Sequence, residues 1–270
     1  MKSPHRFVIA ATILLCLPVV SVFSQVITPI GDINSVDEQG LPTFPGLQTS
    51  DKYTIEGIVI NEPTVFWGGS GERADFILFV QDETGGIQVY SGGWYGGGAL
   101  TYADVPLQVG DRVRVTGLTG SFGGKTNINE RHNKDQKFEI VNLGHVGEPT
   151  PMPITDLAAA IQFDHTRQTG GEYYQGRLVE LQNVHIVDGV WENGGMLTVA
   201  DPAGGTMQVE LRYSTKIPDS PQPEGIFNIV GVFNQEDTET PHTEVYLLWP
   251  RSIADFKTGA SAVENWNLLK

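Results

Sequence analysis

The chain has 270 residues, a single cysteine, and 17 basic against 32 acidic side chains, which gives a formal net charge of −15. This acidity argues against tight, non-specific binding to nucleic acid, which usually draws on a strongly basic surface. The 32 glycines and 16 prolines argue against a fold built from long helices and favour one with many turns.

Residues 1–24 have the layout of a secretory signal peptide. A basic segment, MKSPHR, precedes an apolar run of 14 residues that is too short for a comfortable membrane span. We expect cleavage after Ser24, an extracellular, periplasmic or cell-surface location, and no membrane span in the mature chain; an uncleaved anchor is the alternative. Because Cys16 lies in this segment, the mature chain would have no disulfide and no thiolate site. Loss of Lys2 and Arg6 would leave 15 basic against 32 acidic residues, a net charge of −17.

The first part of the mature chain reads as a short helix followed by strands. A helical candidate covers residues 30–36. The continuous apolar run FILFV at 76–80 indicates a strand covered on both faces, and Asp82-x-x-Gly85-Gly86 then indicates a hairpin turn into 87–90. In DRVRVTG, residues 111–117, apolar and polar residues alternate, which is typical of a half-buried strand. Further strands are expected at 55–59, 124–130 and 138–143.

The second part of the chain repeats the first. FILFVQDETGGIQVY at 76–90 matches GMLTVADPAGGTMQVE at 195–210 with an offset of 119 residues. Gly57 and Gly176 share that offset, and PIGDI at 29–33 echoes PITDL at 153–157. A period above 100 residues indicates two domains of one kind.

We therefore expect a first domain at 25–148, a degenerate second copy at 149–257, and a short tail at 258–270. The elements expected in the second copy are a helix at 154–161 and strands at 173–187, 195–200, 206–213, 225–234 and 243–249.

Several segments resemble the OB-fold modules of secreted bacterial proteins, which often occur beside extracellular nucleases. In the first copy they are YTIEGIVI, FILFVQDETGGIQVY and LQVGDRVRVTG, and in the second YYQGRLVELQNV, MLTVADPAGGTMQV and GIFNIVGV. The resemblance covers about residues 26–256. It implies an all-β chain of two tandem five-stranded OB-like barrels, each preceded by a short helical lead-in. It implies the fold more than the function, because OB folds bind many ligands.

OB folds commonly bind ligands along strands two and three, in the loop after strand one and in the connection between strands four and five. In the first copy these places carry aromatic residues: Trp67 in the first loop, Trp94 and Tyr95 after the third strand, and Phe122 in the four–five connection. Such rings suit stacking on bases or sugars. The alternative is that rings such as Phe66 and Phe122 cap the ends of the barrel.

Basic and amide side chains extend this candidate site. Arg112 and Arg114 lie on the polar side of their strand, Lys125 follows the four–five turn, and Asn127 and Asn129 alternate with an apolar residue. They predict a local basic and polar patch for a ligand. A solvated strand face is the alternative.

The second copy lacks this patch. Aligning Gly117 with Gly231 places Ile226 and Val230 where the first copy has polar residues. Because exposed apolar faces often mark contacts, we interpret the second copy as a packing or spacer module.

We find no sequence pattern of an active site. No two histidines of the mature chain have metal-ligand spacing, and no Gly-x-Ser-x-Gly or phosphate-binding loop occurs. Residues 130–133 suit a solvated loop better than a nuclease site. We expect no enzymatic activity, no metal centre and no cofactor; weak calcium binding remains an open alternative. The expected partner is single-stranded DNA or RNA, with polysaccharide, protein or an extracellular nuclease as alternatives.

Overall fold

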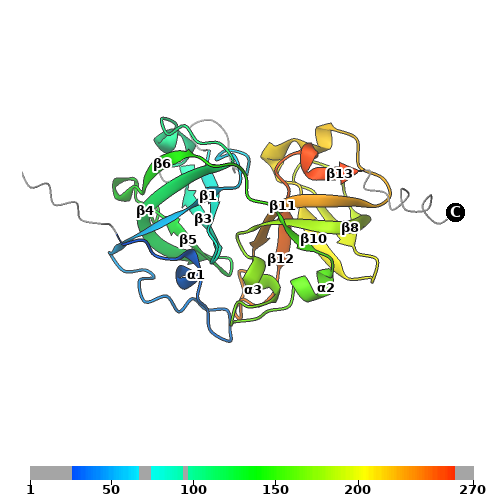
Figure 1. The fold of residues 1–270 in the computed structure, drawn as a ribbon, viewed down its shortest axis with the longest axis horizontal. Helices are drawn as coiled ribbons and strands as arrows, with labels where there is room; N and C mark the ends of the chain where they lie inside the picture. Colours follow the sequence, from blue (N-terminus) through cyan, green and yellow to red (C-terminus); the bar gives the residue numbers. More distant parts are fainter. Residues whose placement is uncertain (1–25, 67–73, 94–96, 259–270) are drawn as a thin grey trace, which may run out of the picture.

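The computed structural model describes residues 26–66, 74–93 and 97–258, which form two β-barrels side by side (Figure 1). This arrangement confirms the all-β, tandem OB-like fold with short helical lead-ins. The expected signal peptide, the tail from residue 259, and the candidates Trp67, Trp94 and Tyr95 lie outside the described residues. No helix in the described ranges combines the length and the apolar character needed to cross a membrane.

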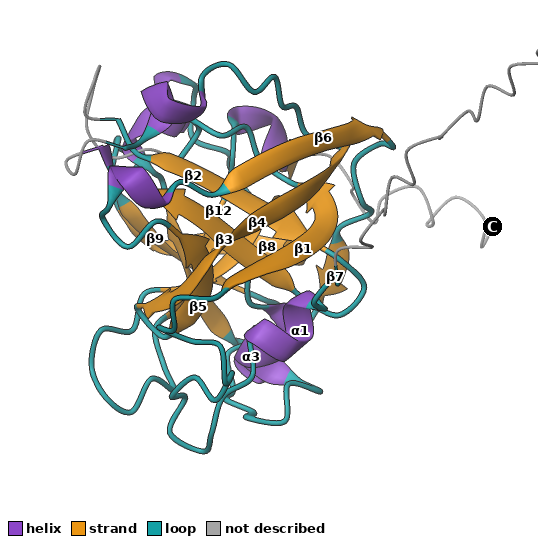
Figure 2. Cartoon of the chain, turned by 90° about the vertical axis from the view of Figure 1, so that its left-hand side faces the viewer, coloured by secondary structure: helices purple, strands orange, loops and turns teal. Residues whose placement is uncertain are grey.

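The first barrel is a closed five-stranded sheet in the order β1-β2-β3-β5-β4, in which β4 pairs back with β1. The parallel pair is β3 with β5. A sixth strand, β6, runs beside β4 (Figure 2). Its elements are α1 (Ile30–Ile33), β1 (Lys52–Val59), β2 (Phe76–Gln81), β3 (Gly86–Ser91), the 3-10 helix η3 (Ala99–Tyr102), β4 (Asp111–Phe122), β5 (Lys125–Asn129), the 3-10 helix η4 (Lys134–Gln136) and β6 (Glu139–His145).

The second barrel has the same connectivity. Strand β11 closes this barrel by pairing with β8. Strands β10 and β12 form the parallel pair, and β13 pairs with β11 as β6 pairs with β4. Its elements are β7 (Met152–Ile154), α2 (Leu157–Ala160), α3 (Gly170–Tyr174), β8 (Leu178–Gly189), β9 (Met196–Ala200), β10 (Thr206–Glu210), η5 (Tyr213–Thr215), η6 (Ile217–Asp219), β11 (Phe227–Gln235), β12 (Tyr246–Trp249), η7 (Ile253–Asp255) and β13 (Phe256–Thr258).

The beginning of the second barrel differs from the sequence prediction. The strand expected from residue 173 begins at Leu178, and the helix α3 takes its first positions. Gly170 and Gly176 have φ angles of +64° and +77°, so the chain turns at both ends of this helix. The alternation of apolar and polar residues could not locate these turns.

The repeated aspartates hold each hairpin to its lead-in helix. The Oδ2 atom of Asp82 accepts a hydrogen bond from the Ile30 N–H at 3.1 Å, and that of Asp201 accepts one from the Leu157 N–H at 2.8 Å. Ile30 therefore corresponds to Leu157. The echo between PIGDI and PITDL, which pairs Ile30 with Ile154, has the wrong register.

The shared offset of Gly57 and Gly176 is also misleading. In the first barrel Gly57 of β1 lies opposite Val113 of β4. In the second barrel Val184 of β8 lies opposite Phe227, the residue of β11 that corresponds to Val113. Gly57 thus corresponds to Val184. Gly176 lies in the turn before β8, because the offset of 119 residues holds for the hairpin turn but not for the first strand.

Each barrel has its own core, and a third apolar cluster joins the two. In this cluster Ile77 and Phe79, on the outer face of β2, pack against Val230, Val232 and Trp249 of β11 and β12. Val230 is buried here, in agreement with the interpretation of the second copy as a packing module, whereas Ile226 is exposed. The apolar cluster fixes the second barrel beside the outer face of the first.

Candidate functional site

A groove of about 470 Å³ lies between the barrels. Its first wall is the outer face of β3 and β5 together with the tip of the β4–β5 hairpin. Its second wall comes from the other barrel and includes Arg212, Glu236 and Trp249. The second copy therefore packs against the first and also completes this groove.

The strand register builds the first wall. On the parallel strands β3 and β5, Gln88 lies opposite Asn127 and Tyr90 lies opposite Asn129. All four side chains line the groove, and the residues between them turn into the barrel core. Because successive side chains of a strand point to opposite faces, the pair Gln88–Asn127 and the pair Tyr90–Asn129 lie next to each other on this wall.

The wall has unused hydrogen-bonding capacity. Asn129 Nδ2 donates to Asn127 Oδ1 at 2.5 Å, and the Arg131 N–H donates to Asn129 Oδ1 at 3.0 Å. Gln88 is only 7% exposed, but its carboxamide atoms are not buried without a partner: they still reach solvent in the groove. An amide has two donors and one acceptor oxygen that a ligand in the groove can use.

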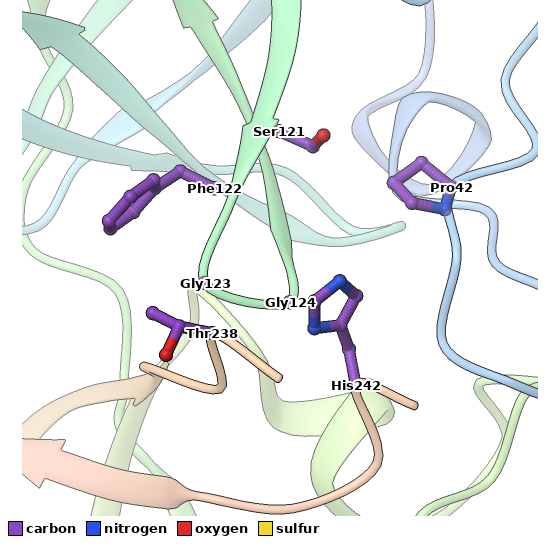
Figure 3. Close-up of a pocket in the computed structure, with 7 residues that line it drawn as sticks. All are labelled: Pro42, Ser121, Phe122, Gly123, Gly124, Thr238 and His242. Atoms are coloured by element: carbon purple, nitrogen blue, oxygen red, sulfur yellow. The ribbon is translucent and has the colours of Figure 1, made fainter. Parts of the chain in front are cut away.

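The hairpin tip presents an aromatic ring at the edge of the groove. Phe122 is 63% exposed, and Gly123 and Gly124 after it have φ angles of +61° and +80°, as a two-residue hairpin turn requires. Figure 3 shows Phe122 on one side of the tip and His242 on the other, and both residues also line a smaller cavity. Phe122 therefore does not cap the barrel, whereas Phe66 is fully buried at the junction.

Lys125 joins the hairpin to the second barrel. Its Nζ donates to the Gln235 carbonyl at 2.6 Å and to Glu236 Oε1 at 2.8 Å, and its side chain is 4% exposed. Burial lowers the pKa of the Lys125 ammonium, and the Glu236 carboxylate opposes this shift. Its charge is thus already compensated within the groove, and a contact with a ligand stays a prediction.

Arg112 and Arg114 belong to a different surface. Arg112 Nη2 lies 2.7 Å from Glu56 Oε2, and Arg114 Nη2 lies 2.5 Å from Glu56 Oε1. The hydrogen bond from Arg114 is the main cause that lowers the pKa of Glu56. Both arginines lie on the half of β4 that pairs with β6, and neither lines the groove.

The predicted site residues therefore divide into two groups. The structure brings Lys125, Asn127 and Asn129 together and leaves the two arginines apart. Gln88 and Tyr90 also line the groove and were not among the predicted site residues, although their alternation with core residues is a usable signal. No local signal connects Arg212 or Trp249 with the first barrel.

The described residues contain no group of three or more histidine, cysteine, aspartate or glutamate side chains arranged to hold a metal ion.

Comparison with protein-family models gives no match, and comparison with curated proteins gives none either. Among solved structures, the chain is similar to a murine DNA-binding protein bound to double-stranded DNA, with 13% identity, a TM-score of 0.36, and coverage of 73% of this chain and 95% of the other. It is similar to the Ifi202 HINa domain in complex with 20-bp double-stranded DNA, with 9% identity, a TM-score of 0.34, and coverage of 73% and 90%. It is also similar to a replication protein A heterotrimer bound to single-stranded DNA, with 10% identity, a TM-score of 0.34, and coverage of 74% and 49%.

Proposed function

We propose that this chain is a secreted, non-catalytic binding protein whose groove holds a single-stranded nucleic acid. The observation that carries the proposal is the register of β3 and β5, which sets Gln88 beside Asn127 and Tyr90 beside Asn129 on the groove wall. Asparagine and glutamine amides hydrogen-bond to base edges, and aromatic rings stack on bases. This wall includes strand three and the connection between strands four and five, two of the places where OB folds commonly bind ligands.

The shape of the groove favours an unpaired strand. The second barrel forms one wall, so a ligand meets Gln88 and Asn127 from within a space enclosed on two sides. Bases in a duplex are stacked and paired, whereas an unpaired strand can turn its base edges towards these amides.

The charges of the groove make binding through bases more important than binding through phosphates. Lys125 is paired with Glu236, and Arg212 is paired with Glu210 at 3.0 Å. Since both cations are already compensated, few counterions would be released when a strand binds. The proposed binding should therefore be weak and depend only modestly on salt.

A polysaccharide is the second candidate ligand, and the same charges favour it. The whole chain carries a net charge of −15, and the groove also contains Asp75. Neutral sugar rings suit a site of amides and aromatic side chains, and OB folds also bind oligosaccharides.

Titration of the mature chain with fluorescent oligonucleotides at about 50 mM and about 200 mM salt tests the proposal. We expect Gln88→Ala and Asn127→Ala to weaken binding by about fivefold or more, the lower limit for one good base contact. Gln208→Ala is the matched control, because Gln208 is exposed on the corresponding strand β10 outside the groove. Absence of binding at low salt would contradict the proposal, and the same variants would then be tested with soluble polysaccharides.

Export is tested separately. We expect the chain recovered from outside the cytoplasm to begin at Gln25, as N-terminal sequencing or mass spectrometry would show. A cytoplasmic, full-length chain would contradict this part of the proposal.

A further inference from the structure

An arginine and a tryptophan of the second barrel stack beside the groove. The Cζ atom of Arg212 lies 4.5 Å from the centroid of the Trp249 ring. The Trp249 Nε1–H donates to Glu210 Oε2 at 2.7 Å, and Arg212 Nη1 donates to Glu210 Oε1 at 3.0 Å. Both stacked side chains line the groove. One carboxylate thus holds the guanidinium and the indole together.

Residues of the first barrel hold Arg212 and Trp249 in place. The Trp249 ring is 2% exposed and packs against Phe66 and Phe79 at centroid distances of 5.2 Å and 6.0 Å. Arg212 Nη2 also donates to the Phe66 carbonyl at 3.2 Å, across the junction. A group held on several sides loses little conformational freedom when a ligand binds.

These contacts limit what Arg212 can offer a ligand. Two of its N–H groups are occupied, and its charge is compensated by Glu210. A guanidinium plane can still stack on a flat ligand, and nucleic-acid bases stack on arginine planes in RNA-binding proteins.

We infer that Arg212, supported by Trp249, is a stacking platform for one unpaired base, contributed by the second barrel opposite the β3–β5 wall. This inference rests on the proposed function, and it makes the groove a composite site that the first barrel alone cannot form. It also predicts which chemical property of Arg212 matters: its planarity rather than its charge.

Two probes of equal charge separate stacking from phosphate attraction. One is a short oligomer of deoxyadenosine, and the other has the same number of abasic deoxyribose phosphates. The ratio of their dissociation constants measures the contribution of the bases, because the phosphate contacts are common to both probes. The full mature chain is titrated with each probe.

Arg212→Lys keeps the charge and removes the plane, and Arg212→Met keeps most of the apolar stem that covers Trp249. We expect both variants to reduce the ratio of the dissociation constant of the abasic probe to that of the deoxyadenosine probe by about fivefold or more, the lower limit for one base stack. Arg251→Lys is the matched control, because Arg251 also reaches across the junction, to the Ile60 carbonyl at 2.7 Å, but does not line the groove.

The outcomes are distinct. A variant that merely lost folded protein would weaken the binding of both probes equally and leave the ratio unchanged, so a reduced ratio supports the platform. An unchanged ratio in well-folded Arg212→Lys and Arg212→Met, with clear discrimination by the parent chain, contradicts the platform alone. Failure of the parent chain to bind either probe contradicts the proposed function itself and the platform with it.

Discussion

Gly86 and Gly176 meet backbone to backbone across the junction between the barrels. A Cβ atom on either residue would overlap the carbonyl group of the other. Gly86 begins β3 in the first barrel, and Gly176 precedes β8 in the second. Nearby, the Leu178 N–H donates to Gln81 Oε1 at 2.8 Å. This close approach sets the distance between the barrels, and the width of the groove depends on that distance.

Gly86→Ala should therefore loosen the junction. We expect the free energy of unfolding to fall by about 1–3 kcal/mol, the usual cost of overpacking. The near-ultraviolet circular dichroism of the junction aromatics should change too. Gly204→Ala is the comparison, since the space around Gly204 is open and only its φ of +90° opposes a side chain. An unchanged aromatic signal in Gly86→Ala would argue against a tight junction.

Asp201 should make stability depend on pH. The hydrogen bond from the Leu157 N–H is the main cause that lowers the pKa of Asp201 in the folded chain. The charged form therefore stabilises the fold above the unfolded-state pKa of about 3.9, and this stabilisation is lost as the pH falls through the lower folded-state pKa. Asp201→Asn should cost about 1–2 kcal/mol at neutral pH and flatten the acid-side decline.

Urea unfolding measured from about pH 6 to about pH 2 checks this expectation. Asp188→Asn, on an exposed part of β8, is the control and should follow the parent curve. Parallel curves for Asp201→Asn and the parent chain would refute the assignment.

Lys125→Met should destabilise the junction. The change leaves the Gln235 carbonyl and the Glu236 carboxylate without their shared cation. Because Glu236 is partly exposed, we expect a loss of about 2–3 kcal/mol, below the usual cost of breaking a fully buried pair. In the double variant Lys125→Met/Glu236→Gln part of this loss should return, which a double-mutant cycle by chemical denaturation measures.

Arg112→Gln/Arg114→Gln should have little effect on oligonucleotide binding. Both arginines are engaged by Glu56 and lie outside the groove. We expect the dissociation constant to change by less than about twofold and the salt dependence to stay the same. A slope reduced by roughly one per arginine would instead show that phosphates bind on that surface.

The mature chain should not turn over nucleic-acid or phosphate-ester substrates. We expect no turnover because the sequence lacks any recognisable nucleophile motif, metal-ligand spacing or phosphate-binding loop. Assays in magnesium, calcium and zinc check this. Turnover that follows the protein through purification and disappears in one point variant would refute a purely binding role.

Local signals in the sequence were sufficient to predict many of the strands and hairpins. Alternation in residues 111–117 and the two Asp-x-x-Gly-Gly turns depend on neighbouring residues, so each strand or hairpin could be recognised alone. The repeat then indicated two domains of one kind, and the resemblance to OB-fold modules implied two barrels, which the strand order confirms. The lead-in and first-strand registers were wrong because the copies differ in the length of the intervening segments.

The candidate site was only partly predictable, because local patterns do not show which residues far apart in the chain come together. Asn127 and Asn129 alternate with a core residue, so their outward direction followed from the sequence. Arg212 and Trp249, which line the same groove, come from the other barrel. Glu56 pairs with Arg112 and Arg114 across the sheet. The sequence by itself determined most of the strands, the faces of the strands with clear alternation, and the duplication, because these depend on patterns that the sequence shows directly. Only the tertiary structure decided which outward faces are buried, which charges are paired and where the groove lies, because those depend on contacts between residues far apart in the chain.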